Sequence, residues 1–191
     1  AWSESNAFAL RSVFPDANGP EDDERSAFMF DDVPVLAGAF SQSSLLLNRL
    51  LTRLTHECIG SAQNVLDLYC GSGNFSLGLT DAQRITGLDH VAHAVGAAMA
   101  QGRGRYLVAG ERTFGKHLEG HSWDAIVLDR PRGGAKQILP WLPKAKTPRM
   151  VYVSCDPATL ARDAKVLAAA DWRVERLVAV DMYPNTPHIE C

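Results

Sequence analysis

The sequence predicts a doubly wound α/β fold, with a mostly parallel central sheet and helices on both of its faces. Short apolar runs rich in β-branched residues alternate along the chain with helix-forming stretches, and this alternation is typical of parallel strands joined by crossover helices. Several of these runs end in Asp or Cys close to Gly or Pro. Open α/β sheets place their chemistry at the carboxyl ends of their strands, so we expect the functional site there.

The expected elements follow a weakly patterned N-terminal part. We expect residues 1–36 to form a peripheral segment, the remnant of a preceding subdomain, and residues 37–191 to form the main domain. That domain opens with a helix over residues 45–58, for which Ser43 or Ser44 is the N-cap. Strands are expected in pieces over 27–36 and then over 64–69, 84–89, 105–108, 123–128, 150–153 and 174–181, and further helices over 75–80, 92–101, 136–142 and 158–169.

Composition describes an ordinary water-soluble chain that works in a reducing compartment. Of its 191 residues, 46% are hydrophobic and 21% are charged, which is typical of a single globular domain. The four cysteines form no CxxC pair, so we expect neither a metal site built by this chain nor a disulfide framework. No apolar run has the length of a membrane span. We therefore expect a cytoplasmic monomer that contacts no membrane.

Charge is distributed unevenly, although the net charge is only −3. Residues 16–32 carry seven acids and one arginine, and residues 130–149 carry six basic residues and no acid. A charge run is usually a solvated face. Because the basic segment lies beside candidate site residues in the sequence, contact with phosphate groups is the alternative.

The strand over 64–69 leads into a glycine-rich turn, DLYCGSGNF, and the next strand ends at Asp89. Glycines let a backbone approach a ligand closely, and a carboxylate at the second strand end suits the two hydroxyls of an adenosine ribose. The loop reads GSGN rather than GxGxxG, which favours a nucleoside ligand without phosphates over a dinucleotide. DxYCGSGN is typical of S-adenosylmethionine-dependent methyltransferases. A simple tight turn between strand and helix would not need both acids.

Two later strands also end in reactive groups. Asp129 precedes the basic and glycine-rich loop RPRGG and faces the same cleft, unless it is only a helix N-cap. In MVYVSCDPATL, Cys155 stands between the end of a strand and the start of a helix, whose dipole favours a thiolate. Most lone cysteines are instead small buried hydrophobes. His188 and Glu190 follow in a proline-rich C-terminal loop.

Five segments, GAFSQ, DLYCGSGNF, LDRPRGGA, YVSCDPATLARD and MYPNTPHIE, together resemble the catalytic domain of the RNA uracil-5-methyltransferases. That family acts on bacterial 23S ribosomal RNA and on the T-loop uridine of transfer RNA. The resemblance covers residues 34–191 and implies a Rossmann-like methyltransferase fold that uses S-adenosyl-L-methionine. It also implies that the family's N-terminal RNA-binding domain, and the cysteine cluster that holds an iron–sulfur centre in some members, are absent from this chain.

The resemblance implies a covalent mechanism and a set of site residues. Cys155 would add to C6 of the uracil and make C5 nucleophilic, and Glu190 would remove the C5 proton after methyl transfer. The target uridine would be flipped into the cleft. Residues that would line the cofactor and base cleft are Gln42, Tyr69, Asn74, Asp89, Glu111 and Asp129, with no metal ligand among them.

The chain departs from the family pattern at three places. The segment Asp129-Arg130-Pro131-Arg132 stands where Asp-Pro-Pro-Arg or Asp-Pro-Ala-Arg is usual, so Arg130 takes the place of a proline. Ser44 stands where the family commonly has asparagine. Residues 96–106 are shorter than usual, so the match of Glu111 rests on an open alignment. The alternatives are a non-catalytic RNA-binding module of the same fold, which would have lost the cysteine or the glutamate, and a cytosine-5 RNA methyltransferase, whose Pro-Cys or Thr-Cys signatures this chain lacks.

Overall fold

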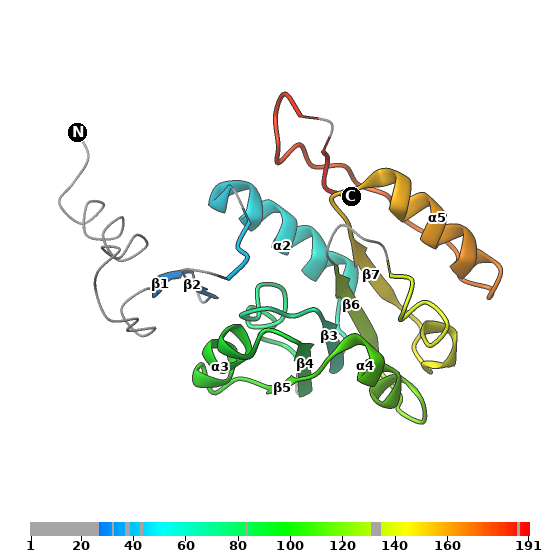
Figure 1. Ribbon diagram of the computed structural model, residues 1–191, viewed down its shortest axis with the longest axis horizontal. Helices are drawn as coiled ribbons and strands as arrows, with labels where there is room; N and C mark the ends of the chain where they lie inside the picture. The colour runs from blue at the N-terminus through cyan, green and yellow to red at the C-terminus, as the bar shows by residue number, and fades with distance from the viewer. Residues whose placement is uncertain are drawn as a thin grey trace.

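A central parallel sheet of five strands dominates the computed structural model (Figure 1). The strand order is β5 (Arg105–Val108), β4 (Arg84–Asp89), β3 (Asn64–Leu68), β6 (Ala125–Asp129) and β7 (Met150–Val153). Every neighbouring pair is parallel. The chain leaves β3 toward one edge and later returns to the other, so the order reverses between β3 and β6, where such sheets bind ligands. The structure describes residues 27–31, 33–36, 39–42, 44–82, 84–130, 135–186 and 188–191.

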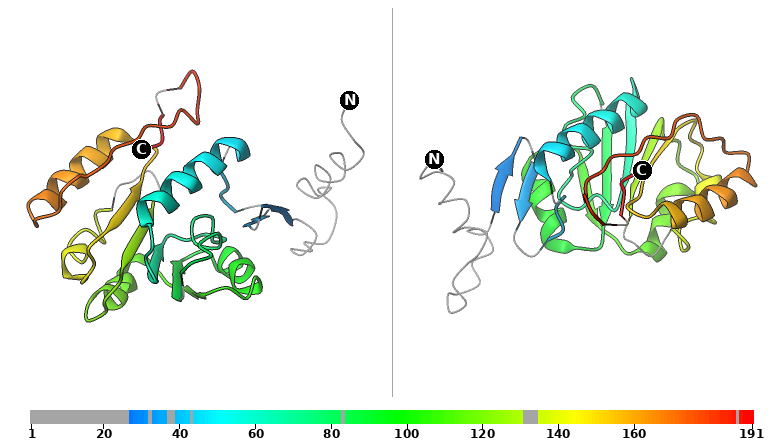
Figure 2. Two further views of the ribbon diagram at one scale, coloured as in Figure 1. Left: turned by 180° about the vertical axis from the view of Figure 1, so that it is seen from behind. Right: turned by 90° about the horizontal axis from the view of Figure 1, so that it is seen from above.

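Helices cover both faces of the sheet (Figure 2), as a doubly wound fold requires. One face packs against α2 (Leu45–Ile59) and α3 (Ala92–Ala100). The other face packs against α4 (Glu111–Leu118), α5 (Pro157–Ala168) and the short 3-10 helix η2 (Leu142–Lys144). The central strands β3 and β6 are therefore buried on both sides, which explains why they read as nearly continuous apolar runs.

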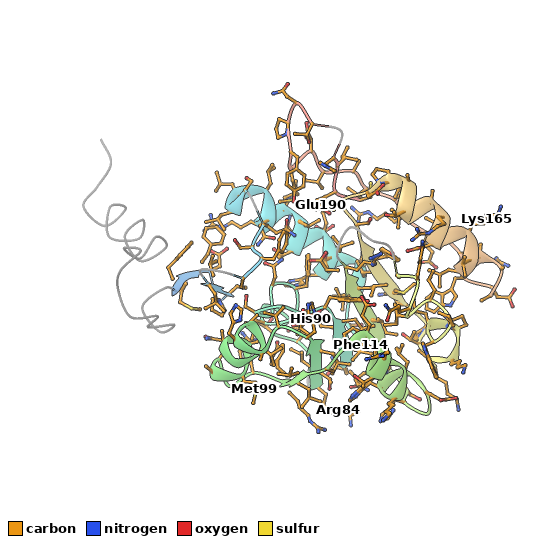
Figure 3. All side chains as sticks on the ribbon, in the orientation of Figure 1. Arg84, His90, Met99, Phe114, Lys165 and Glu190 are labelled. Carbon is orange, nitrogen blue, oxygen red and sulfur yellow. The ribbon has the colours of Figure 1, made fainter. Side chains whose placement is uncertain are left out.

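The successive side chains of β3 show how one strand serves two cores. Val65 belongs to the cluster that contains Leu51 of α2 and Val95 of α3. Leu66 and Leu68 belong to the cluster on the other face, with Phe114 of α4, which Figure 3 labels, and Leu167 of α5. All three strand residues have no exposed surface. The period-two alternation of a strand thus divides the apolar residues between the two layers.

A small antiparallel hairpin, β1 (Ala27–Phe30) and β2 (Val33–Leu36), confirms the strand-like pieces expected before the main domain. Its turn contains Asp31, whose φ is 52° and whose carboxylate accepts two hydrogen bonds, of 2.9 and 2.7 Å, from Arg49 of α2. The Ser72 hydroxyl of the glycine-rich turn donates to the Pro34 carbonyl at 2.7 Å. The hairpin is therefore tied to both α2 and that turn. The domain division after residue 36 stays a prediction, and residues 1–26 lie outside the described part of the chain.

The helix predicted over residues 75–80 is wrong, because this stretch is a series of turns. An α-helix would need the Leu79 amide to donate to the Phe75 carbonyl. Instead the Leu79 amide donates to Ser76, and the Phe75 carbonyl lies 2.7 Å from Nε2 of His56. A helix of six residues also has too few hydrogen bonds to offset its nucleation cost. The buried side chains of Phe75, Leu77 and Leu79 fix the turns instead.

Two more predicted elements differ in the structure, and one helix was not predicted. In place of the helix predicted over residues 136–142, residues 136–141 form turns that lead into η2, because Pro140 and Pro143 have no amide hydrogen to donate. Residues 174–179 form no strand, since a groove of about 890 Å³ lies between this segment and β7. The unpredicted α4 has eight residues and buries Phe114 and Leu118, a pattern too short to identify in the sequence.

The remaining predicted elements are confirmed, with ends within two residues of the predicted ones and with Ser44 as the N-cap of α2. Its hydroxyl accepts a hydrogen bond of 3.3 Å from the Leu47 amide. Ser44 stands where the family commonly has asparagine, and in this chain its hydroxyl caps the start of α2. Among the described residues, no helix is both long and apolar enough to cross a membrane.

Candidate active site

The turn after β3 has a backbone that few sequences can adopt. Tyr69 has a φ of 60°, Gly71 of 52° and Gly73 of 89°, all in the left-handed region that favours glycine. A Cβ atom on Gly73 would lie 2.6 Å from Cγ of Leu77. The turn therefore requires glycine at position 73, and its backbone is open to close approach by a ligand.

Asp89 fixes this turn from the end of the neighbouring strand. Its Oδ2 accepts a hydrogen bond of 2.9 Å from the Gly71 amide, and its Oδ1 accepts one of 2.8 Å from the Val91 amide. Oδ1 also lies 3.3 Å from Nδ1 of His90. Oδ2 has two lone pairs, so it keeps one acceptor position for a hydroxyl group. The predicted ribose-binding acid thus also has a structural role.

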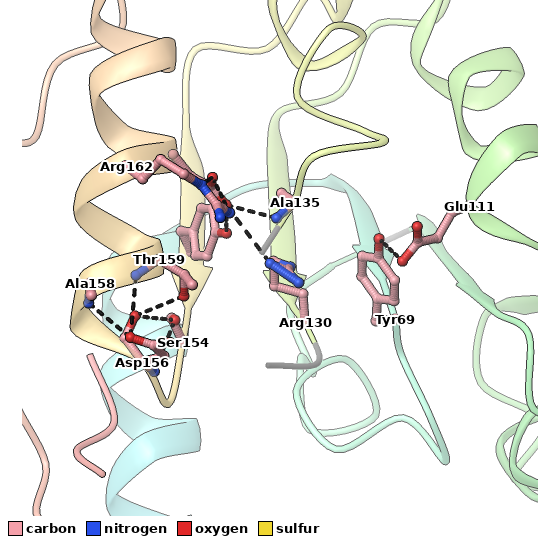
Figure 4. A network of polar contacts seen from close by, with 11 residues as sticks. Tyr69, Glu111, Arg130, Ala135, Ser154, Asp156, Ala158, Thr159 and Arg162 are labelled. Carbon is pink, nitrogen blue, oxygen red and sulfur yellow. Dashed lines mark hydrogen bonds and ion pairs between the residues drawn. The ribbon is translucent and has the colours of Figure 1, made fainter. Parts of the chain in front are cut away.

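Glu111, whose match to the family was insecure, lies beside the predicted cofactor turn. The Tyr69 hydroxyl donates a hydrogen bond of 2.8 Å to Oε1 of Glu111 in the first turn of α4 (Figure 4). The Tyr69 ring meets the Phe114 ring edge-on, with centroids 5.1 Å apart. Burial, together with the Glu111 carboxylate, raises the pKa of Tyr69 well above its usual range. The pair therefore joins β3 to α4 at the edge of the site.

Asn74 is held by a residue that the sequence did not single out. Nδ2 of Asn48, on α2, donates to Oδ1 of Asn74 at 2.7 Å, and Nδ2 of Asn74 donates back to Oδ1 of Asn48 at 3.1 Å. This reciprocal pair fixes the orientation of both amides. Gln42 is also buried, and its Oε1 accepts no hydrogen bond from the described residues. A buried acceptor without a partner is costly, so it favours a ligand at this position.

Four acids gather at the carboxyl ends of the strands. The pKa of Asp129 is raised well above its ordinary value by burial and then by the charges of Glu190, Asp67 and Asp89, against the opposing effect of Arg130. This electrostatic coupling indicates that the acids share one region, although they come from three strands and the C-terminal segment. Carboxylates that repel one another in this way are typical of functional sites.

Asp67, the penultimate residue of β3, is fully buried, and neither of its carboxylate oxygens has a hydrogen-bond partner among the described residues. Burial raises its pKa from 3.8 to about 7, with the Asp89 charge adding to the shift and the nearby Ser76 hydroxyl opposing it. The folded protein therefore binds a proton at Asp67 more tightly than the unfolded chain does. The contribution of Asp67 to the free energy of unfolding is therefore fully present below pH 3.8 and is lost as the pH rises through 7.

Replacing Asp67 with asparagine should consequently stabilise the fold more at pH 8 than at pH 5. At pH 5 the wild-type side chain is already neutral, whereas at pH 8 it carries a buried charge that costs a few kcal/mol. Urea unfolding at the two pH values measures the difference. The same substitution at the exposed Asp81 is the control and should show no such pH dependence. An equal effect of Asp67→Asn at both pH values would contradict the raised pKa.

Cys155 lies between the end of β7 and the start of α5. Asp156 is the N-cap of α5, and its Oδ1 accepts hydrogen bonds of 2.9 and 3.2 Å from the amides of Ala158 and Thr159 (Figure 4). Pro157 occupies the first helical position, where its fixed φ suits a helix start. The half-buried Cys155 is therefore held at a helix N-terminus, as the sequence predicted.

Backbone pairing brings the C-terminal residues to the same place. Ser154 and Cys191 exchange hydrogen bonds of 3.0 and 2.9 Å, and Val180 and Glu190 exchange bonds of 2.7 and 3.0 Å. Figure 3 labels Glu190 at this end of the sheet, near the start of α5. Glu190 directly precedes Cys191, and Cys155 directly follows Ser154. The pairing of Ser154 with Cys191 therefore brings Glu190 close to Cys155 along the backbone.

The Glu190 carboxyl is 3% exposed, and its Oε2 has no hydrogen-bond partner among the described residues. Burial raises its pKa above 4.5, against a hydrogen bond from Tyr183 that lowers it. His188, its neighbour in the motif, packs edge-on against the Tyr183 ring at 6.2 Å. Glu190 therefore has the properties of a carboxyl prepared to take a proton, and His188 has a packing role.

The basic segment is divided between opposite ends of the sheet, which corrects the expectation that it lies beside the site. The Lys146 carbonyl accepts from the Trp123 amide before β6, and Nη1 of Arg149 donates to the Ile59 carbonyl at the end of α2. Lys144 pairs with Glu119 at 3.8 Å. These residues precede β7 and lie at the amino ends of the strands. Pro131 and Arg132 lie outside the described residues.

This fold and site define a class of protein. A parallel sheet with its switch point between β3 and β6, a glycine-rich turn and acids at successive strand ends are the features of the nucleoside-binding α/β methyltransferases.

Comparison with known proteins gives the family. The model of the tRNA (uracil-5-)-methyltransferase family matches residues 91–191, more than half of the chain. The chain therefore belongs to this family, and the predicted Rossmann-like methyltransferase fold is confirmed. The Pyrococcus abyssi tRNA (uracil-54, C5)-methyltransferase, solved in complex with S-adenosyl-L-homocysteine, is similar with a TM-score of 0.73 and 30% identity over 86% of this chain and 42% of that one.

Two curated relatives are 23S rRNA (uracil(1939)-C(5))-methyltransferases named RlmD. The protein of Acinetobacter baylyi is 34% identical over 165 residues, which cover 79% of this chain and 36% of the relative. The protein of Shewanella sp. strain W3-18-1 is 36% identical over 165 residues, which cover 80% of this chain and 36% of the relative. The chain thus spans little more than a third of the length of these relatives.

Proposed function

We propose that this chain is the catalytic part of an RNA uracil-5-methyltransferase, which transfers a methyl group from S-adenosyl-L-methionine to C5 of a uridine in ribosomal or transfer RNA. The observation that carries the proposal is the pairing of Ser154 with Cys191, because it brings the buried Glu190 to the strand end that holds Cys155. A nucleophile and a carboxyl base in one place are what C5 chemistry needs. We expect the protein to act as a monomer in the cytoplasm.

The residues present fit the cofactor. The unsatisfied buried oxygen of Gln42 and the open glycine turn provide a place for a nucleoside, and Asp89 retains acceptor capacity for a ribose hydroxyl. The fixed amide of Asn74 and the Tyr69–Glu111 pair border the same turn. We assign cofactor binding to Gln42, Tyr69, Asn74, Asp89, Glu111 and Asp129. When bound, S-adenosylmethionine supplies a methyl group on a positively charged sulfur.

The chemistry then depends on the protein's own groups. Uracil C5 is a poor nucleophile, so the Cys155 thiolate adds to C6 and the electron pair of the C5–C6 double bond is displaced toward the C4 carbonyl. The resulting enolate makes C5 nucleophilic and able to take the methyl group. Glu190 next removes the proton from C5, the C5–C6 double bond re-forms, and the thiolate leaves C6. The raised pKa of Glu190 suits this role, because a general base works best with a pKa near the working pH.

The same arrangement disfavours a non-catalytic RNA-binding module. A protein that only binds RNA has no use for a buried carboxyl of which one oxygen has no hydrogen-bond partner among the described residues, since that oxygen costs stability. The family match likewise favours uracil over cytosine as the target base.

RNA contact through Lys136 gives a test of the substrate class. Lys136 is exposed and follows Ala135, which is anchored to α5 near the candidate site. Lys136→Ala should weaken RNA binding and reduce the slope of log affinity against log salt by about 0.7 to 0.9. Lys146→Ala is the matched control, because Lys146 lies at the opposite end of the sheet. Equal slopes for the wild type and Lys136→Ala, measured by fluorescence titration, would contradict the phosphate contact.

A further inference from the structure

Asp163, in the middle of α5, is the centre of a buried polar network that crosses three elements (Figure 4). Its Oδ2 accepts hydrogen bonds of 2.7 Å from both the Ala135 amide and the Tyr152 hydroxyl, and its Oδ1 accepts one of 2.8 Å from Nε of Arg162. Nη1 of Arg130 lies 3.8 Å from Oδ2. The side chain of Asp163 is fully buried. A single carboxylate thus holds groups from β7, from α5 itself and from the chain that leaves β6.

Two of these partners stand at the two ends of one connection. Arg130 directly follows Asp129 at the end of β6, and Ala135 lies five residues further along the chain. Burial alone would raise the pKa of Asp163, but the hydrogen bonds from Ala135, Tyr152 and Arg162 outweigh it and lower the pKa. The carboxylate therefore stays charged and holds both ends of the connection against α5.

Cys155 directly precedes the N-cap of the same helix. The N-cap, Asp156, precedes Asp163 by seven residues, which is about 10 Å along a helix axis. Because a capped helix is stiff over two turns, the positions of Cys155 and of the Asp163 network cannot change independently. α5 therefore connects the candidate nucleophile to the chain next to Asp129.

We propose that Asp163 is a positioning residue that holds Arg130 and Ala135, which follow Asp129 in the chain, against α5, so that Asp129 and Cys155 keep one relative geometry for the target base. This inference rests on the proposed function. Arg130 stands where proline is usual in the sequences this chain resembles, and its buried guanidinium also acts electrostatically on Asp129 and Tyr69. Asp163 supplies the negative charge that this buried cation needs.

Asp163→Asn tests the inference in the natural protein. The substitution keeps the shape and removes the charge and one of the two acceptor oxygens. We expect kcat for methyl transfer to fall by at least about tenfold, because small misplacements of reacting groups are costly, while the affinity for S-adenosylmethionine stays within about threefold. Hydrogen exchange at the Ala135 amide should accelerate by at least about tenfold, since the neutral amide oxygen that remains is a weaker acceptor than the carboxylate. Asp171→Asn, at an exposed position just after α5, is the matched control and should change neither quantity.

Two further variants keep the test decisive. Tyr152→Phe removes a single donor with little change in volume and should lower kcat by a few-fold, even if Asp163→Asn folds poorly. Arg130→Met combined with Asp163→Asn should cost less than the sum of the two single changes, because the two residues share one network.

Unchanged kcat in both Asp163→Asn and Tyr152→Phe, in a wild type that methylates RNA, would overturn this inference and leave the proposed function standing. Faster exchange at Ala135 with unchanged kcat would also overturn it, because the residue would then have only a structural role. A wild type that makes no 5-methyluridine in ribosomal and transfer RNA from a strain lacking the gene would contradict the proposed function, and this inference with it.

Discussion

Cys155→Ala is expected to abolish methyl transfer to RNA while the affinity for S-adenosylmethionine changes by less than about threefold. Without a thiolate at C6, C5 of uracil is not nucleophilic enough to take the methyl group. Cys155 lies at the end of β7, whereas the predicted cofactor residues surround the turn after β3 and the end of β4. The substitution should therefore affect the reaction and not cofactor binding. Methyl incorporation into RNA and calorimetric titration of the cofactor measure the two effects.

The chain provides a matched control for this experiment. Cys58 is a half-buried free cysteine on α2, and Cys58→Ala makes the same chemical change far from the candidate nucleophile in sequence. The Cys58→Ala variant should keep the turnover rate of the wild type. Turnover retained by Cys155→Ala would rule out the covalent mechanism, and turnover lost equally in both variants would indicate damage to the fold.

Glu190→Gln is expected to accumulate a covalent protein–RNA adduct in the presence of S-adenosylmethionine, visible as a band that resists denaturation. Glutamine has the shape of glutamate but cannot accept the C5 proton, so the reaction should stop after methyl transfer with Cys155 still attached to C6. Loss of a positioned general base costs about 10² to 10⁴ in rate, and we expect a decrease of that size in turnover.

The wild type should show a matching pH dependence. Glu190 must be ionised to act as a base, and burial raises its pKa above the ordinary value. The turnover rate should therefore increase with pH through that raised pKa and then level off. Glu175→Gln, at an exposed position, is the control and should leave the profile unchanged. Normal turnover of Glu190→Gln would show that another group removes the proton.

The parts of the fold that the sequence predicted are those in which burial and local pattern agree. The strands Arg84–Asp89, Arg105–Val108 and Met150–Val153 have the predicted bounds, because each combines β-branched or aromatic residues with at least one buried position. The predicted elements that the structure contradicts are those whose conformation depends on tertiary contacts. His56 takes the Phe75 carbonyl that a helix would have used, and no pattern in residues 75–80 reveals this competition.

The residues of the candidate site likewise divide into those that the sequence could identify and those that it could not. Residues at strand ends could be identified because a parallel sheet brings the carboxyl ends of its strands together. Their partners could not be identified, since Asn48 is 26 residues from Asn74 and Asp163 is 28 residues from Ala135. Asp163 stands in the resembling segment YVSCDPATLARD, but in the sequence it reads as an ordinary polar helix residue. The opposite locations of Lys136 and Lys146 likewise depend on where η2 and β7 direct the chain.

The roles of Cys155 and Glu190 remain predictions, and one measurement tests the covalent step by Cys155 most directly. RNA containing 5-fluorouridine carries at C5 a fluorine atom that a base cannot remove as a proton, so the adduct formed after methyl transfer cannot be released. Incubating the wild type with this RNA and S-adenosylmethionine, followed by mass spectrometry of the digested protein, identifies the attached residue. The proposed mechanism predicts a methylated 5-fluorouridine bound to the peptide that contains Cys155. An adduct on another cysteine, or methylated RNA product without any adduct, would contradict it.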